Sequence, residues 1–140
     1  MVKKTTGAFA LALILAACGP GEESDNTLVI GDRFFVTQIM DIFMNPRIHV
    51  GRTIQYEGLF RTLVWVTGND NFAVIRYTIG CCGEEPIGLR ILLPDGMEPF
   101  ANDAWVRVTG ILERSNGSPV VRATSIVETA ERGASFVDPR

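Results

Sequence analysis

Apolar residues recur at helical spacing in one early segment of this chain. Between residues 33 and 44 they fall on one face of a helix, at Phe35, Ile39, Ile42 and Phe43. Asn45-Pro46 ends the pattern, because the residue before a proline avoids the helical region. The spacing therefore predicts a single short α-helix that packs against a sheet.

Five later segments have the alternating or continuously apolar pattern of strands, and turn residues separate them. They cover residues 53–63, 72–79, 87–93, 105–113 and 119–128. Gly58 interrupts the first segment and predicts a bend, and Asn116-Gly117 between the last two predicts a hairpin. The chain is therefore expected to be mainly β, as a five-stranded OB-like barrel preceded by one short helix. An SH3-like barrel or a small sandwich has the same strand count.

The N-terminus has the pattern of a cleaved lipoprotein signal peptide. A basic start precedes an uncharged apolar run over residues 7–17, and Ala16-Ala17 lead directly into Cys18. These 11 residues are too few for a membrane-spanning helix, which needs about 20. In this class of signal the cysteine thiol takes a diacylglycerol and the chain is cut before it. An ordinary signal peptide is the alternative.

This signal divides the chain into four expected parts. Residues 1–17 are the signal peptide, 18–32 a lipidated flexible tether, 33–130 the OB-like barrel domain and 131–140 a loose tail. Several acyl chains on Cys18 would hold the protein on a lipid bilayer in the cell envelope. Gly19, where an aspartate would signal otherwise, favours the outer membrane facing the periplasm if the host is Gram-negative.

Composition narrows the classes of function. Removal of residues 1–17 takes both lysines and leaves eleven arginines against sixteen acidic residues, a net charge of −5. An acidic, exported chain argues against nucleic acid as a partner. The absence of lysine excludes Schiff-base chemistry, and His49 is the single histidine available to any catalytic triad. We therefore expect a protein that is not an enzyme.

The adjacent pair Cys81-Cys82 is the strongest candidate for chemistry. A vicinal disulfide would be strained, because neighbouring Cα atoms lie about 3.8 Å apart and ordinary disulfides need about 4.4–6.8 Å. Thiolates also select Zn or Cu, but both would have to leave the alternating geometry of a strand to share one ion. Gly80 and Gly83 give the backbone that freedom. The third possibility is an inert pair, with one cysteine buried in the core and the other half-buried.

Further ligands are within the same short segment. Glu84 and Glu85 follow the cysteines, and His49 is a possible ligand from the loop after the helix. Neighbouring carboxylates disfavour the thiolate unless a bound cation, Arg76 or Arg90 offsets their charge. The candidate site is therefore Cys81 and Cys82, with Glu84, Glu85 or His49 as additional metal ligands.

Several short motifs resemble known domains. Asn45-Pro46, Gly51-Arg52-Thr53-Ile54 and Gly58 resemble the N-terminal part of bacterial OB-like domains. Over residues 33–129 the chain resembles the C-terminal soluble domain of YcgQ-type proteins, on these motifs: Val74-Ile75-Arg76-Tyr77, Cys81-Cys82, Pro86-Ile87-Gly88-Leu89, Trp105-Val106-Arg107-Val108-Thr109-Gly110 and Ala123-Thr124-Ser125-Ile126. That resemblance implies a subunit of a two-component membrane permease complex. This chain differs from that family in its expected lipid anchor, which stands where the family has membrane spans.

These observations give one expected function and two alternatives. The expected function is binding of a metal ion or a thiol-reactive solute at Cys81-Cys82, in support of an integral membrane permease. The first alternative is a non-catalytic protein-interaction domain with structural cysteines. The second is a thiol-redox protein.

Overall fold

The computed structural model describes residues 26–64 and 71–139. The elements, in chain order, are β1 (Thr27–Ile30), a 3₁₀ turn (Asp32–Phe34), α1 (Phe35–Met44), α2 (Pro46–His49), β2 (Thr53–Thr62), β3 (Phe72–Gly80), β4 (Gly83–Leu92), β5 (Trp105–Ser115) and β6 (Ser118–Glu128). The expected helix ends at Asn45, as predicted, but Pro46 begins a second helix of four residues. None of the helices in these residues is long and apolar enough to cross a membrane.

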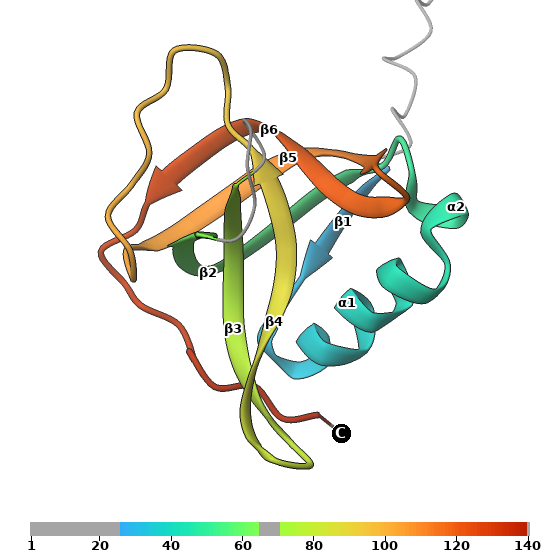
Figure 1. Cartoon of the computed structure of the whole chain (residues 1–140), viewed down its shortest axis with the longest axis vertical. Helices are drawn as coiled ribbons and strands as arrows, with labels where there is room; N and C mark the ends of the chain where they lie inside the picture. Colours follow the sequence, from blue (N-terminus) through green and yellow to red (C-terminus); the bar gives the residue numbers. More distant parts are fainter. Residues whose placement is uncertain (1–25, 65–70, 140) are drawn as a thin grey trace, which may run out of the picture.

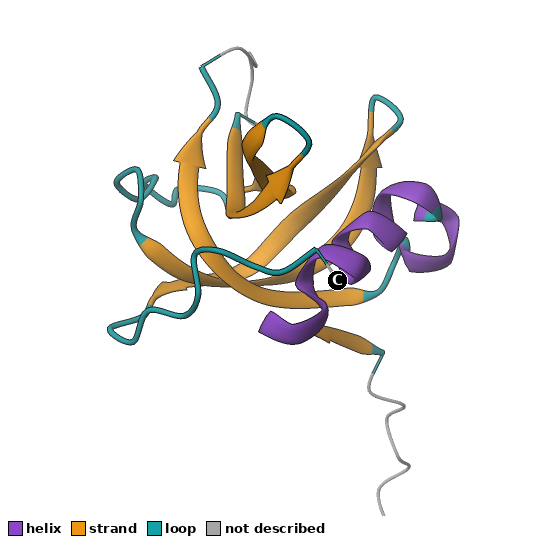
Figure 2. Cartoon of the chain, turned by 90° about the horizontal axis from the view of Figure 1, so that it is seen from below, coloured by secondary structure: helices purple, strands orange, loops and turns teal. Residues whose placement is uncertain are grey.

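The strands form one curled sheet in the order β1-β2-β3-β4-β6-β5, with a further pairing between β2 and β5 (Figures 1 and 2). β2 pairs with β3 over four residue pairs, and β4 pairs with β6 over three. The sheet therefore curls round on itself but is not a closed barrel. The expected mainly β architecture is confirmed, whereas the expected count of five strands is wrong because the described sheet has six.

The additional strand is β1, which lies in the segment expected to be a flexible tether. Thr27–Ile30 pairs in parallel with the start of β2, from Thr27 opposite Thr53 to Ile30 opposite Tyr56. The pairing satisfies backbone groups along an edge of β2 and buries Ile30, which is 3% exposed. The last part of the expected tether is thus part of the fold.

The curvature of the sheet depends on the bend predicted at Gly58. Residues 53–59 of β2 pair with β5, and from Leu59 onward β2 pairs with β3. A Cβ on Gly58 would lie 2.6 Å from the carbonyl oxygen of Ile75, so no side chain fits where the strands cross. A register shift at Thr109/Gly110 adds to the curvature on β5.

The core lies inside the curl and is covered by α1. The helix buries Phe35, Ile39 and Ile42 against the sheet, and the Phe35 ring packs edge-on against Tyr56. Tyr56 is buried, and its hydroxyl donates a hydrogen bond of 2.8 Å to the carbonyl oxygen of Val74. Phe43, the fourth member of the predicted apolar face, is 43% exposed.

The C-terminal residues expected to be a loose tail pack against β3. Phe136 forms a β-bridge to Tyr77, whose N–H donates to the Ser135 carbonyl at 2.7 Å. The rings of Tyr77 and Phe136 lie 5.9 Å apart, and Val137 is buried. β3 pairs with β2 only as far as Ile75, so the tail covers the open edge beyond it.

Candidate functional site

Cys81 and Cys82 form the turn that joins β3 to β4 (Figure 1). Gly80 pairs with Gly83, so the two cysteines alone make the loop of the hairpin. Their Sγ atoms lie 3.3 Å apart, and both residues are exposed free thiols. The turn supplies the irregular backbone that lets two adjacent side chains face the same side. The expected burial of these cysteines is therefore wrong.

Gly83 makes this turn possible. Its φ is +126°, in the range that residues with a side chain rarely adopt. Strands β3 and β4 both continue to the turn. Glu84 and Glu85 therefore belong to β4, whereas the sequence predicted that the next strand begins only at residue 87.

The two carboxylates lie on β4 beside the cysteines, and both are exposed. Glu85 stands opposite Thr78, and its side chain lies over Gly80, where a Cβ would be 2.1 Å from the carboxyl carbon. The hydrogen bond to Cys82 and the nearby charge of Glu85 raise the pKa of the Cys81 thiol. In the absence of a cation, Cys81 is thus held more strongly in its protonated form than an ordinary cysteine.

His49 is not part of this cluster. It is the last residue of α2 and 5% exposed, and α2 lies well away from the β3–β4 turn in Figure 1. Its Nε2 lies 2.7 Å from Asp41 Oδ2, and its Nδ1 lies 3.3 Å from Arg52 Nη1. Hydrogen bonds from Asn45 and His49 lower the pKa of Asp41. The expected contribution of His49 to a site at the cysteines is wrong, because both ring nitrogens serve local structure.

Within residues 26–64 and 71–139, no cluster of three or more His, Cys, Asp or Glu side chains has the geometry to hold a metal ion. The cysteine turn offers two thiol ligands, with the carboxylates of β4 close behind them. Cys18, the expected lipidation site, lies outside the described residues.

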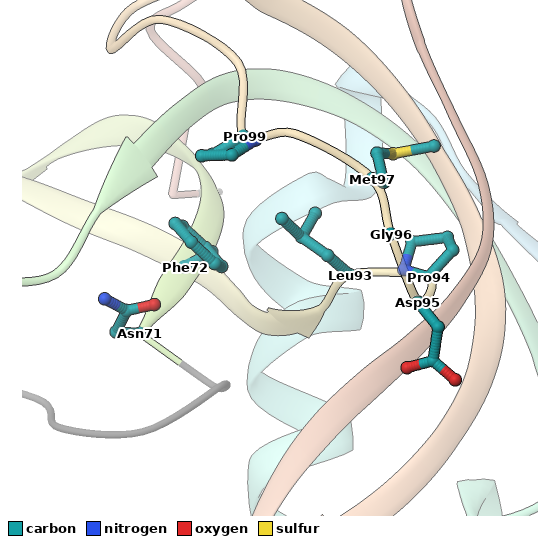
Figure 3. Close-up of a pocket in the computed structure, with 8 residues that line it drawn as sticks. All are labelled: Asn71, Phe72, Leu93, Pro94, Asp95, Gly96, Met97 and Pro99. Carbon is teal, nitrogen blue, oxygen red and sulfur yellow. The ribbon is translucent and has the colours of Figure 1, made fainter.

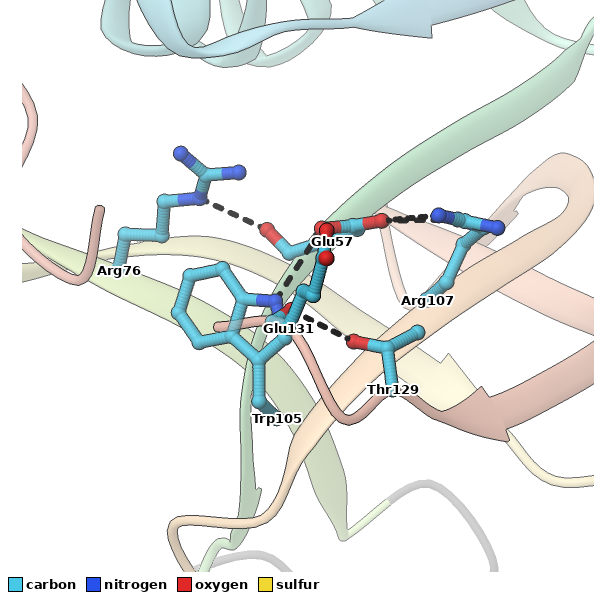
Figure 4. A network of polar contacts seen from close by, with 6 residues as sticks. All are labelled: Glu57, Arg76, Trp105, Arg107, Thr129 and Glu131. Atoms are coloured by element: carbon cyan, nitrogen blue, oxygen red, sulfur yellow. Dashed lines mark hydrogen bonds and ion pairs between the residues drawn. The ribbon is translucent and has the colours of Figure 1, made fainter. Parts of the chain in front are cut away.

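The structure contains a partly buried polar network around Arg76 that the sequence did not indicate (Figure 4). Arg76 on β3 is 2% exposed, and it donates to Asp32 at 2.5 Å and to the carbonyl oxygen of Glu57 at 2.8 Å. Its guanidinium lies over the rings of Phe35 and Trp105. The sequence had suggested that Arg76 offsets the charge of the carboxylates beside the cysteines. It does not, because its guanidinium is paired with Asp32.

Glu57 extends the network on β2. One carboxylate oxygen accepts from Arg107 at 2.8 Å, and the other accepts from the indole N–H of Trp105 at 3.2 Å. A cavity of about 260 Å³ lies beside Arg76 and Arg107. The Asp32–Arg76 pair therefore fastens the 3₁₀ turn to β3, and the Glu57–Arg107 pair joins β2 to β5.

Two further cavities lie away from the cysteines. One of about 320 Å³ lies between Phe72 and the turn at residues 94–97, where the carboxylate of Asp95 points away from Phe72 (Figure 3). The other, of about 490 Å³, lies along β3 and β4 and is lined by the apolar Ala73 and Ile75 together with Arg61 and Arg90. Neither cavity includes a cysteine.

Comparison with known proteins identifies the family. No curated protein matches the chain. The model of the DUF1980 C-terminal domain matches residues 17–136, which include all three cysteines and every described element. The match agrees with the resemblance to the C-terminal domain of YcgQ-type proteins. The chain therefore belongs to the DUF1980 C-terminal domain family.

Proposed function

We propose that this protein is a lipid-anchored accessory domain of the cell envelope. Its cysteine turn would bind a Zn or Cu ion, or a thiol-reactive solute, and pass it to an integral membrane permease. The curled sheet serves as an OB-like support for the turn. The observation that carries the proposal is the pair of exposed Sγ atoms 3.3 Å apart at the end of a hairpin.

The spacing of the two thiols suits a shared ion. Zn–S bonds of about 2.3 Å in tetrahedral geometry place two sulfurs about 3.8 Å apart, so the pair needs to open by about half an ångström. A bound cation also removes the obstacle to ionisation, since it stabilises both thiolates and the nearby charge of Glu85.

Two protein thiolates would leave the ion's remaining positions open. A closed structural site supplies all of its ligands from the protein, whereas an open one can exchange its ion with a partner. Glu84 or Glu85 could occupy a third coordination position until the ion is transferred. An exposed, incomplete site of this kind fits transfer better than storage.

The raised pKa of Cys81 bears on the thiol-redox alternative. The nucleophile of thiol–disulfide exchange is the thiolate, and its formation is disfavoured here by Cys82 and Glu85. Redox proteins of this chemistry instead lower the pKa of the attacking cysteine. We therefore favour ligand binding over redox exchange.

Calorimetry on the full chain, with its thiols kept reduced, tests the proposal. We expect about one equivalent of Zn(II) or Cu(I) to bind, with an affinity that falls as the pH is lowered, because both thiols must lose a proton. Cys81→Ser/Cys82→Ser should abolish binding and retain cooperative melting. His49→Gln should leave the stoichiometry unchanged.

Two results would overturn the proposal. One is the absence of stoichiometric binding of either ion. The other is loss of cooperative melting in the double variant, which would give the cysteines a structural role.

A further inference from the structure

The corner between α1 and α2 exposes a group of apolar side chains. Met44, Ile48 and Val50 are 73%, 69% and 45% exposed, although they lie within seven consecutive residues. Arg47 is exposed among them, in the last turn of α2. We call these four residues the α2 corner. Contiguous exposed apolar residues bounded by polar ones commonly mark a contact surface.

The chain enters the fold beside the α2 corner. β1 begins at Thr27, which pairs with Thr53, three residues after Val50. Paired strands lie about 4.8 Å apart, and Figure 1 shows β1 beginning close to α2. Asn26 is eight residues after Cys18, and a chain of that length reaches at most about 29 Å. An anchor at Cys18 would thus keep this end of the domain close to the bilayer.

We propose that the α2 corner rests on the lipid surface of the membrane that holds the anchor. The inference builds on the lipid anchor of the proposed function. It adds a second contact that fixes how the domain is oriented. The occupant is a bilayer with anionic headgroups.

The charges near the α2 corner favour such a surface. Arg47 belongs to the corner, and Arg114 is exposed two residues after Leu112, whose backbone bonds to Gly51 and Arg52. Each arginine near an anionic surface strengthens binding by roughly fivefold. Among the described residues, the acidic Asp41 and Glu113 near the corner have partners, His49 and Arg122.

Because the anchor tethers the domain to the bilayer, a weak contact is sufficient to orient it. A short linker gives an effective concentration in the millimolar range, so a small apolar patch is occupied once the anchor is in place. A second copy of the chain fits less well, because three exposed side chains are far short of the roughly 1,000 Å² of a stable interface.

Docking would determine where the cysteines point. In Figure 1 the β3–β4 turn lies at the bottom of the molecule, whereas α2 lies at the right-hand side, well above the turn. A domain that rests on its α2 corner therefore directs Cys81 and Cys82 away from the lipid that anchors it. The thiols would meet ligands or a partner in the aqueous phase, beyond the surface of that membrane.

Lipid-quenching measurements on the anchored full chain test this orientation. An environment-sensitive fluorophore is attached to Ile48→Cys in a Cys81→Ser/Cys82→Ser background. The chain is placed in vesicles of phosphatidylethanolamine and phosphatidylglycerol that contain doxyl-labelled lipid. Val127→Cys in the same background is the matched control, since Val127 is 47% exposed near the end of β6. The native cysteines, labelled in the unsubstituted chain, report on the turn.

We expect quenching at position 48 to be at least about threefold stronger than at position 127 or at the turn. Met44→Glu/Val50→Glu should abolish this difference and leave the anchor intact. Equal quenching at positions 48 and 127, or strongest quenching at the turn, would overturn the proposal. So would energy transfer between copies that replaces lipid quenching, because it would identify a second chain as the occupant.

The experiments distinguish failure of the lipid-anchor hypothesis from failure of the docking hypothesis. If Cys18→Ser leaves membrane fractionation unchanged, the lipid anchor of the proposed function is wrong. If Cys18→Ser releases the chain but position 48 of the anchored chain is not quenched, only the docking contact is wrong.

Discussion

The Cys81 thiol is the residue whose environment bears most directly on function. Its pKa is raised first by the hydrogen bond with Cys82 and then by the charge of Glu85. The second cause is a single side chain that can be neutralised without changing its shape. Glu84 is adjacent to Glu85 in sequence, but it is not among the groups that shift this pKa.

Glu85→Gln should therefore make Cys81 more reactive. Removing the negative charge lowers the thiol pKa, so at pH 7.5 a larger fraction is thiolate and alkylation by iodoacetamide should be roughly two- to fivefold faster. Glu84→Gln is the matched control and should leave the rate nearly unchanged. Equal acceleration by both variants would show that the general acidity of the turn is responsible.

Arg76 is a buried charged residue, so loss of its ion-pair partner should lower the stability of the fold. Asp32→Ala removes the carboxylate that pairs with Arg76, a residue that is 2% exposed. The guanidinium then retains its hydrogen bond to the carbonyl oxygen of Glu57. Because Asp32 itself is 63% exposed, we expect a loss of about 1–2 kcal/mol in the free energy of unfolding.

Asp103→Asn is the matched control in urea denaturation, because asparagine tolerates the φ of +69° at this position. It breaks the ion pair with Arg61; the side chains of Arg61 and Asp103 are 36% and 57% exposed, so the loss should be about 0–1 kcal/mol. A larger loss for Asp103→Asn than for Asp32→Ala would contradict this account of Arg76.

The sequence indicates which face Arg76 occupies but not what it binds. Val74, Arg76 and Thr78 alternate along β3 and share the inward face, so the position could be predicted from strand periodicity. The partner, Asp32, is 44 residues away and is brought there by the long-range pairing of β1 with β2. His49 is similar, since its contacts depend on how α2 folds back toward Asp41.

Among the elements, the hairpins show which turns local sequence can predict. Asn116-Gly117 has positive φ at both residues and joins β5 to β6, as its sequence indicated. The β3–β4 turn has no such signature, because only Gly83 after the cysteines has a positive φ. The sequence therefore indicated a connection there, and it did not reveal that Glu84 and Glu85 belong to a strand.

β1 and the C-terminal tail could not be predicted from their own residues. β1 has four residues, too few for a clear alternating pattern, and it is a strand because one edge of β2 is open beside it. Residues 135–137 likewise pair where β3 extends beyond β2. In both cases the partner strand, and not the local sequence, determines the structure.

Gly83→Ala should destabilise the hairpin. A φ of +126° is costly for any residue with a Cβ, and we expect a loss of roughly 1–2 kcal/mol in the free energy of unfolding. Gly31→Ala is the control, because Gly31 has a φ of −93° and nothing within 4 Å of an added Cβ. It should change stability by less than about 0.5 kcal/mol. Similar losses for both variants would show that the strain at Gly83 does not limit stability.

For the whole molecule, the sequence predicted the class of fold and most of its strands. It did not predict how the sheet curls, because β2 divides its pairing between β5 and β3 and β4 lies beside β6 in parallel. Such pairings join residues far apart in the chain and depend on packing of the whole core. The candidate site was easier to predict from the sequence than the curl of the sheet. Its members Cys81, Cys82, Glu84 and Glu85 are so close in the chain that any turn brings them together.

The distribution of charge over the whole molecule distinguishes it from domains of similar build that bind nucleic acid. OB-like domains hold single strands in a basic groove with stacking aromatic residues. Here Arg61 lies at the cavity along β3 and β4 but is paired with Asp103. Further arginines are tied to acidic partners elsewhere, in the pairs Arg76–Asp32, Arg107–Glu57 and Arg122–Glu113.

We therefore predict no salt-sensitive binding of single-stranded DNA. With a net charge of −3 and with Arg61, Arg76, Arg107 and Arg122 in ion pairs, the full chain should bind a fluorescent oligonucleotide more weakly than a dissociation constant of about 100 μM, even in low salt. Polarisation titrations at about 50 and 200 mM salt measure this, and Asp103→Asn, which frees Arg61, sets the sensitivity of the assay. Micromolar binding by the unsubstituted chain that weakens at least about tenfold between the two salt concentrations would identify a phosphate-binding surface and contradict the prediction.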